Sequence, residues 1–548
     1  MSGASSTRGR FRAFALLPVA VAMAAPLLVA CSRDGEDAAS KPGTVTFPEA
    51  ASPFVAFDVW VRVGSQHDPA GKEGLAVLTA ALLAAGSSQD DPYPSILEQL
   101  YPMAADYSAF VDKEMTTFRG VVHRDNLDGY YRLLRNAILR PAFAAEDFER
   151  VKRQQLDYVE RGRRFQRDEE LSKELLFAMA YRGTPYAHPE EGTVRSVRGL
   201  TLDDARDFYR RHYTRDSVVV GIGGGYPEGF PARARTDFDA LPPGEVPAVP
   251  PPQPRRPAGI EVLIVEKDTD ATAISLGFPI DVVRGDDDYW PLFLAASWLG
   301  EHRSSFGRLY QVLREQRGMN YGDYAYVEAF PLGFTTMDRP INVARRSQLF
   351  EVWIRPVSGT GGENGDDLHD RALFATRAAL REVGRLADGG VPAEQVERTK
   401  TYLGNNAVTF GATLLRRLGF AIDDAFYGLP DPGFLRSVRE RVGALDTEAV
   451  AGAVGRHLRS DGLYLVFVTR DAAALREKLL AGEPTPIRYA GEQPPEVLAE
   501  DNEIASSRLA VTADAIEIVD ISGVFEGDGP AAAEATADES RGTSAGGS

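Results

Sequence analysis

The chain has little cysteine and little histidine for its length. Cys31 is the single cysteine among 548 residues, so no disulfide can form within the chain. No two of the seven histidines are close enough in sequence to lie on one side of a helix as paired metal ligands. A disulfide scaffold and a helical two-histidine metal motif are therefore excluded, whereas a metal site assembled from distant residues stays open. The histidines are His67, His123, His188, His212, His302, His369 and His457.

Basic residues are outnumbered by acidic ones, 61 to 79. The formal net charge is −18, but residues 491–548 hold thirteen acidic residues against two arginines, a net of −11. The rest of the chain is only mildly acidic, and no nucleic-acid partner is expected. Apolar content of 44% and charged content of 26% are ordinary for a globular protein, and the length allows two to four domains.

The apolar run near the start of the chain is too short to span a membrane comfortably. It covers residues 14–28, follows a basic segment with Arg8 and Arg12, and leads into Leu28-Val29-Ala30-Cys31. This pattern resembles a bacterial lipoprotein signal, so we expect a lipid on Cys31 and a location in the cell envelope, membrane-anchored and facing the periplasm. Ser32, which follows the cysteine, favours the outer membrane. The alternative is a plain cleaved signal or weak anchor in which Cys31 is incidental.

Two halves of similar plan follow the signal segment. Each half begins with a strand and an apolar helix, at 54–63 and 71–85 in the first half and at 271–277 and 289–300 in the second. A long charged helix is predicted from 145 to 165. The sequence thus predicts a signal peptide at 1–31, a tether at 32–44, a domain at 45–241, a proline-rich linker at 242–259, a second domain at 260–490 and an acidic, largely disordered tail at 491–548.

Segments of both halves resemble the insulinase, pitrilysin and mitochondrial processing peptidase family, which are metallopeptidases with an inverted zinc motif. In the first half the resemblance is carried by 63–76, by 103–120 and by Tyr186-Ala187-His188-Pro189, and in the second half by 305–321. It implies an α+β fold of two homologous domains. Each domain would be a sandwich of helices packed on a mixed or antiparallel sheet, and the two would close like a clam.

The zinc ligands of this family are missing at the expected place. Active members carry His-x-x-Glu-His on a helix, and the resemblance aligns these positions with Val77, Ala80 and Ala81. None of these side chains can bind zinc or accept a proton. The family's spacing of about 77 residues places the third ligand at Tyr158, beside Asp157 and near Glu160, and a carboxylate of this segment at that position is the alternative. Either way, we expect no metal on this chain.

A second family feature is retained. Arg314 and Tyr321 match an Arg/Tyr pair that, in the family, reaches toward the substrate bound at the other domain's zinc. A tyrosine hydroxyl can donate to an oxyanion, and a guanidinium can hold a carbonyl or carboxylate. The alternative is structural, with Arg314 capping a helix in a surface ion pair and Tyr321 packed in a sheet.

The resemblance implies a non-catalytic subunit of a heterodimeric envelope metallopeptidase. In this hypothesis a zinc-bearing family member is the partner, zinc is bound there, and unfolded peptides bind by adding a strand to a sheet edge. The protein alone would then be a pseudoenzyme. Two alternatives stay open: a peptide-binding or scaffold lipoprotein without proteolytic function, and an active peptidase with an unorthodox site.

Overall fold

The structure is a computed structural model, which describes residues 43–165, 167–246, 248–333, 336–359, 367–459, 461–489 and 491–527. The predicted signal peptide, Cys31, most of the tether and residues 528–548 lie outside the described residues. Among the helices of the described ranges, none combines the length and apolar character that crossing a membrane requires.

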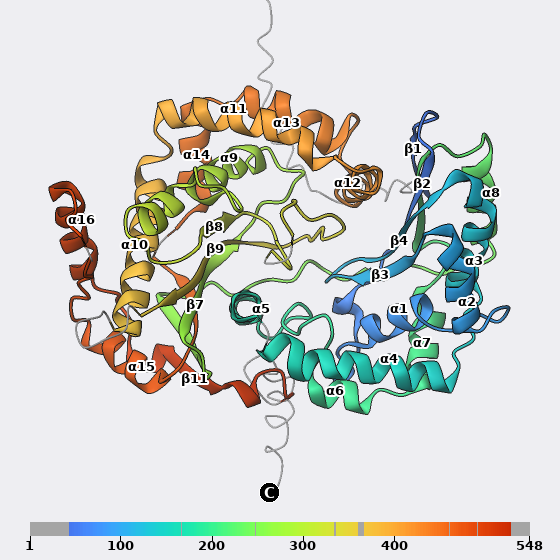
Figure 1. Cartoon of the computed structure of the whole chain (residues 1–548), viewed down its shortest axis with the longest axis horizontal. Helices are drawn as coiled ribbons and strands as arrows, with labels where there is room; N and C mark the ends of the chain where they lie inside the picture. The colour runs from blue at the N-terminus through green and yellow to red at the C-terminus, as the bar shows by residue number, and fades with distance from the viewer. Residues whose placement is uncertain are drawn as a thin grey trace, which may run out of the picture. The chain divides into compact units, whose positions relative to one another are not determined.

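Each half contains one sheet, and Figure 1 shows the two sheets with helices packed on them. The strand order is β1-β5-β2-β4-β3 in the first sheet and β11-β6-β10-β7-β9-β8 in the second. The first sheet comprises β1 (Thr44–Pro48), β2 (Phe54–Val61), β3 (Tyr107–Val111), β4 (Thr116–His123) and β5 (Val218–Gly224). The second comprises β6 (Ile260–Glu266), β7 (Ala271–Ile280), β8 (Asp323–Tyr326), β9 (Gln348–Ser358), β10 (Leu463–Thr469) and β11 (Ile516–Asp520).

The two sheets have the same topology apart from the added strand β11. β1 runs parallel to β5, and the remaining pairs of the first sheet are antiparallel. Likewise β6 runs parallel to β10, and β10, β7, β9 and β8 pair antiparallel in turn. This correspondence confirms the predicted α+β fold of two related halves. It also makes β3 and β8 equivalent, each the terminal strand of its sheet.

Helices cover both sheets. The first half contains α1 (Leu75–Ala84), α2 (Tyr93–Leu100), α3 (Leu127–Leu139), α4 (Ala145–Asp157), α5 (Asp168–Ala180), α6 (Val194–Gly199), α7 (Leu202–His212) and α8 (Phe230–Phe238). The second contains α9 (Tyr289–Gly300), α10 (Leu368–Gly389), α11 (Ala393–Phe410), α12 (Leu414–Tyr427), α13 (Gly433–Gly443), α14 (Thr447–His457), α15 (Ala472–Ala481) and α16 (Pro495–Ser506). The helix predicted over 145–165 differs: α4 ends at Asp157 and a π-helix covers Tyr158–Arg163.

One helix from each half packs on the sheet of the other half. Helix α5 packs on β7, β9 and β10 of the second sheet, where Leu175 and Leu176 lie against Val265 and Val466. Helix α12 packs on β1, β2 and β5 of the first sheet, and places Ile422 beside Trp60. Figure 1 shows α12 next to β2 and α5 next to β7. Burying each helix on the other half ties the two halves together through apolar contact.

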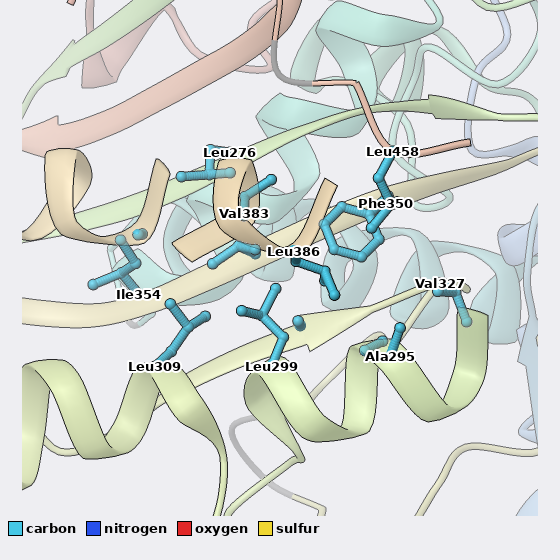
Figure 2. Close-up of a cluster of buried hydrophobic side chains, with 14 of the residues drawn as sticks. Leu276, Ala295, Leu299, Leu309, Val327, Phe350, Ile354, Val383, Leu386 and Leu458 are labelled. Carbon is cyan, nitrogen blue, oxygen red and sulfur yellow. The ribbon is translucent and has the colours of Figure 1, made fainter. Parts of the chain in front are cut away.

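The largest apolar core belongs to the second half. It lies between the sheet and the helices α9, α10, α11 and α14, and Figure 2 shows Leu276, Leu299, Phe350 and Leu386 within it. Helix α9 is apolar on nearly all sides, as its sequence predicts, and is buried accordingly. A separate core supports the first sheet, around Phe57, Tyr130 and Tyr131.

The segment predicted as a largely disordered acidic tail begins with ordered structure. Helix α16 packs on α10, and β11 extends the second sheet parallel to β6. The buried guanidinium of Arg317 contacts Glu500 at 2.9 Å and Asp501 at 2.7 Å, which neutralises part of the acidic charge. Farther on, Phe525 is buried, and its carbonyl accepts a hydrogen bond from Val194 N at 2.9 Å. Composition alone could not predict these contacts, because each one depends on a residue that is far away in the sequence.

Candidate functional site

Helix α1 carries the positions of the missing zinc motif, and the preceding loop fixes where the helix begins. The Asp68 carboxylate accepts hydrogen bonds from Gly74 N and Ala76 N, both at 2.7 Å. Gly74 has a φ of 93°, and a Cβ there would lie 2.4 Å from the Glu191 carbonyl oxygen. The residues before α1 that resemble the family therefore fix the backbone at the start of the helix, and this role requires no metal ion.

The side chains at the motif positions do not fit a zinc ion. Ala80 is buried, whereas Val77 and Ala81 are half-buried, and none of the three offers a lone pair. In the described part of the chain, no group of three or more His, Cys, Asp or Glu side chains is arranged to hold a metal ion. No step of zinc chemistry can therefore be assigned to α1.

Tyr158 begins the π-helix and lines a cavity. The residue is 38% exposed, and the Arg163 guanidinium lies 5.8 Å from the centroid of its ring. π-Helical turns often accompany functional sites because they shift side chains out of the regular helical spacing. Here the turn brings Tyr158, Gly162 and Arg163 to the same cavity wall.

The cavity has a volume of about 120 Å³ and is formed by both halves. Phe110 and Val111, at the end of the terminal strand β3, line one part. Helix α5 contributes Lys173, and the second half contributes Phe330 and Glu351. The cavity therefore adjoins β3, which among the described residues pairs on one side only, with β4.

Ion pairs surround the cavity on the side of the first half. The Arg163 guanidinium contacts Glu174 at 2.9 Å and also pairs with Glu191. Glu190 lies 3.1 Å from the Lys113 ammonium and 3.6 Å from Arg163. Burial alone would raise the pKa of Glu190, but Lys113, Arg345 and Arg163 outweigh that cost and lower the pKa to about 2.

Arg345 joins the second half to this network. Its Nε donates to Asp112 at 2.8 Å, and its guanidinium lies 3.4 Å from Glu190. Both Arg345 and Asp112 are almost fully buried. A buried pair of this kind is costly to break, because the remaining partner keeps an uncompensated charge. The network therefore fixes the two halves around the cavity.

The predicted pair, Arg314 and Tyr321, lies outside the lining of this cavity. The Arg314 guanidinium stacks over the Tyr321 ring at 4.9 Å and donates to the Asn320 carbonyl at 2.9 Å. Tyr321 is 74% exposed, and neither residue lines the cavity at Tyr158. The structure stacks the two side chains on each other and does not bring either of them to the cavity at Tyr158.

Sequence reasoning missed the residues that the second half contributes. Glu351 stands between Phe350 and Val352, within the apolar part of β9, and the residue is 6% exposed. An acidic residue in a buried strand is unusual, and this was the available signal. Lys173 gave no comparable signal, because its α5 environment depends on packing across the two halves.

The fold and this site define a metallopeptidase-like protein of two related halves in which the motif helix lacks metal ligands. Residues 44–194 match the family described as insulinase (peptidase family M16), and residues 199–403 match the peptidase M16 inactive domain. The chain belongs to the insulinase family.

Related proteins agree with this assignment. A protein named as an uncharacterized zinc protease from Mycobacterium bovis is 29% identical over 275 residues, covering 50% of this chain and 61% of the relative. Another so named, from Bacillus subtilis, is 23% identical over 277 residues, covering 50% and 65%. The chain therefore spans less than two thirds of these relatives. A crystal structure of a peptidase M16 inactive domain from Pseudomonas fluorescens has a TM-score of 0.67 at 20% identity, covering 79% of this chain and 96% of that one.

Proposed function

We propose that this protein is the zinc-less subunit of a two-subunit peptidase of the bacterial cell envelope. It would hold an extended peptide along β3 while a zinc-bearing member of the family cuts that peptide. The observation that carries the proposal is the motif helix: Val77, Ala80 and Ala81 offer no ligand, yet the free edge of β3 and the adjacent cavity persist. Membrane attachment through a lipid on Cys31 is part of the same proposal.

A second candidate is a peptide-binding or scaffold lipoprotein with no proteolytic partner. The placement of Arg314 and Tyr321 favours it, since the pair is away from the cavity and Tyr321 is largely exposed. The exposure of Tyr321 is also compatible with the two-subunit proposal, because a side chain that contacts a substrate held by the partner subunit must be accessible in the isolated subunit.

Co-purification separates the two candidates. The full-length chain, tagged after Ser548, is isolated from solubilised membranes, and the eluate is analysed by mass spectrometry, zinc content and cleavage of an unfolded protein. A stoichiometric partner with an intact His-x-x-Glu-His motif, about one zinc per pair and cleavage by the pair alone would support the peptidase subunit. Recovery of the chain without such a partner would refute it and favour the scaffold.

A further inference from the structure

The last described segment of the chain, residues 516–527, is an addition to the duplicated plan of the two halves. The corresponding strands of the two sheets end with β5 and β10, each followed by a helix, whereas β11 has no counterpart among the described strands of the first sheet. The segment also lies outside both family matches, which cover 44–194 and 199–403. The shared plan of the halves therefore does not account for this segment.

One end of the segment is attached to the second half. β11 lies parallel to β6 over five residue pairs, beginning with Ile516 opposite Val262. Among the described strands only β6 pairs with β11, so β11 is the terminal strand of this sheet. A terminal strand can leave its sheet while the pairing of the other strands stays intact, because it shares hydrogen bonds with one neighbour only.

The other end is attached to the first half, at the start of α6. The Phe525 carbonyl accepts a hydrogen bond from Val194 N at 2.9 Å, and the Glu526 carbonyl accepts one from Arg195 N at 3.1 Å. The two backbones lie close together here, since a Cβ at Gly527 would lie 2.8 Å from the Arg195 Cβ. Helix α6 in turn packs on α4 of the first half. The segment therefore spans the two halves, and Figure 1 shows the red end of the chain running from β11 toward α6.

Arg164 holds the segment at the point where the chain passes from one half to the other. This buried residue follows the π-helix of the first half and precedes α5, which packs on the second sheet. Its Nε donates to the Val524 carbonyl at 2.6 Å, and its guanidinium contacts the Glu526 carboxylate at 2.9 Å. Such charge-assisted contacts are stronger than hydrogen bonds between neutral groups. The segment is thus fixed to the crossing of the chain as well as to α6.

Apolar burial completes the attachment. Val524 and Phe525 are each 2% exposed and belong to a cluster that both halves share, with Tyr186 and Val194 from the first half and Val265 from the second. Release of the segment would expose part of this cluster to water, and the hydrophobic effect opposes that exposure. The apolar contact therefore holds the halves together at the same place as the Arg164 contacts.

We propose that residues 516–527 form a releasable strap that limits how far the two halves can move apart. Bound as in this structure, the strap joins β6 of the second half to α6 of the first. Release at the Phe525 end removes this link without unpairing any strand that the two sheets have in common. The halves then stay joined through the packing of α5 and α12, and the angle between them can change. The inference concerns conformation and is independent of the proposed peptidase role.

Two measurements on the full-length chain test the strap. Pulsed electron spin resonance gives the distance between spin labels on Glu149→Cys in α4 and Glu448→Cys in α14, which are exposed positions in the two halves. Cys31→Ser removes the chain's single native cysteine, so that only these two positions are labelled. Amide hydrogen exchange followed by mass spectrometry reports separately whether residues 516–527 have been released.

Two variants weaken the strap from opposite sides. Phe525→Asp places a charge in the apolar cluster, and aspartate tolerates the left-handed backbone at this position, where φ is 56°. Arg164→Gln removes the guanidinium that contacts the strap. The control is Leu498→Asp, which introduces the same side chain at an exposed position of α16. Thermal melts show whether each variant is folded.

We expect exchange at residues 516–527 to become about 10²-fold faster in Phe525→Asp, as for loss of a buried aromatic side chain, and about 10-fold faster in Arg164→Gln. In both variants the distance distribution should gain a longer component, and Leu498→Asp should change neither measurement. Faster exchange with an unchanged distance would refute the strap, because the segment would then be an added strand that does not restrain the halves. Unchanged exchange in both variants, or unfolding of the whole chain in both, would also refute a strap that can be released.

Discussion

Burial of the Glu351 carboxylate predicts a pH-dependent penalty on the stability of the folded protein. Its pKa rises from an ordinary 4.5 to about 7 in the fold, chiefly through burial. The folded state thus holds the proton more tightly than the unfolded state, and stability falls as pH rises between these two values. The shift of about 2.5 units corresponds to about 3 kcal/mol, which is fully present below pH 4.5 and lost above about pH 7.

Glu351→Gln removes this titration while keeping the shape of the side chain. The variant should match the native protein near pH 4.5 and exceed its unfolding free energy by about 3 kcal/mol at pH 8. Urea unfolding of both proteins at several pH values between 4.5 and 8 gives the difference directly, and Glu440→Gln, at an exposed position of α13, is the control. A gain that is equal at all pH values, or a loss that grows with pH, would show that Glu351 has a partner in the fold and would refute the reasoning.

Three further predictions concern the remaining residues. Arg345→Met should lower the free energy of unfolding in urea by about 3–5 kcal/mol, because Asp112 then keeps a buried charge without a partner. Adding Asp112→Asn should recover part of this loss. If the effects of the two substitutions simply add, the pairing is contradicted. Tyr321→Phe should reduce turnover of the proposed two-subunit peptidase about 10²-fold without affecting assembly, and unchanged turnover would exclude the oxyanion role. Cys31→Ser should release the protein from the membrane fraction, and continued retention would argue against lipidation.

The two halves could be predicted because their signals are local. The apolar helix at 71–85, the strand at 54–63 and the prolines of the linker are each visible within a short window of sequence. The order of the sheet strands and the exchange of α5 and α12 could not be predicted, since both depend on contacts between segments far apart in sequence. Glu351 was missed for the same reason, because the cavity that it lines is formed by residues of both halves.

The tail shows how composition can mislead. Thirteen acidic residues against two arginines favour disorder when the segment is considered alone. In the fold, Arg317 and Arg381 face this segment, and Glu500 contacts the Arg317 guanidinium at 2.9 Å. Carboxylates that would repel one another in an isolated segment form ion pairs with arginines of the second half. Burial of Phe525 adds an apolar contact.

Two features of the described residues argue against a zinc site at this cavity. Helix α1 has no side chain that could hold a metal, and the carboxylates nearest Tyr158 are already paired, Glu174 and Glu191 with the Arg163 guanidinium. A metal at this place would have to displace charge-assisted hydrogen bonds before it gained a ligand. The remaining lining carboxylate, Glu351, belongs to β9 in the second half, and one carboxylate alone does not hold a catalytic zinc.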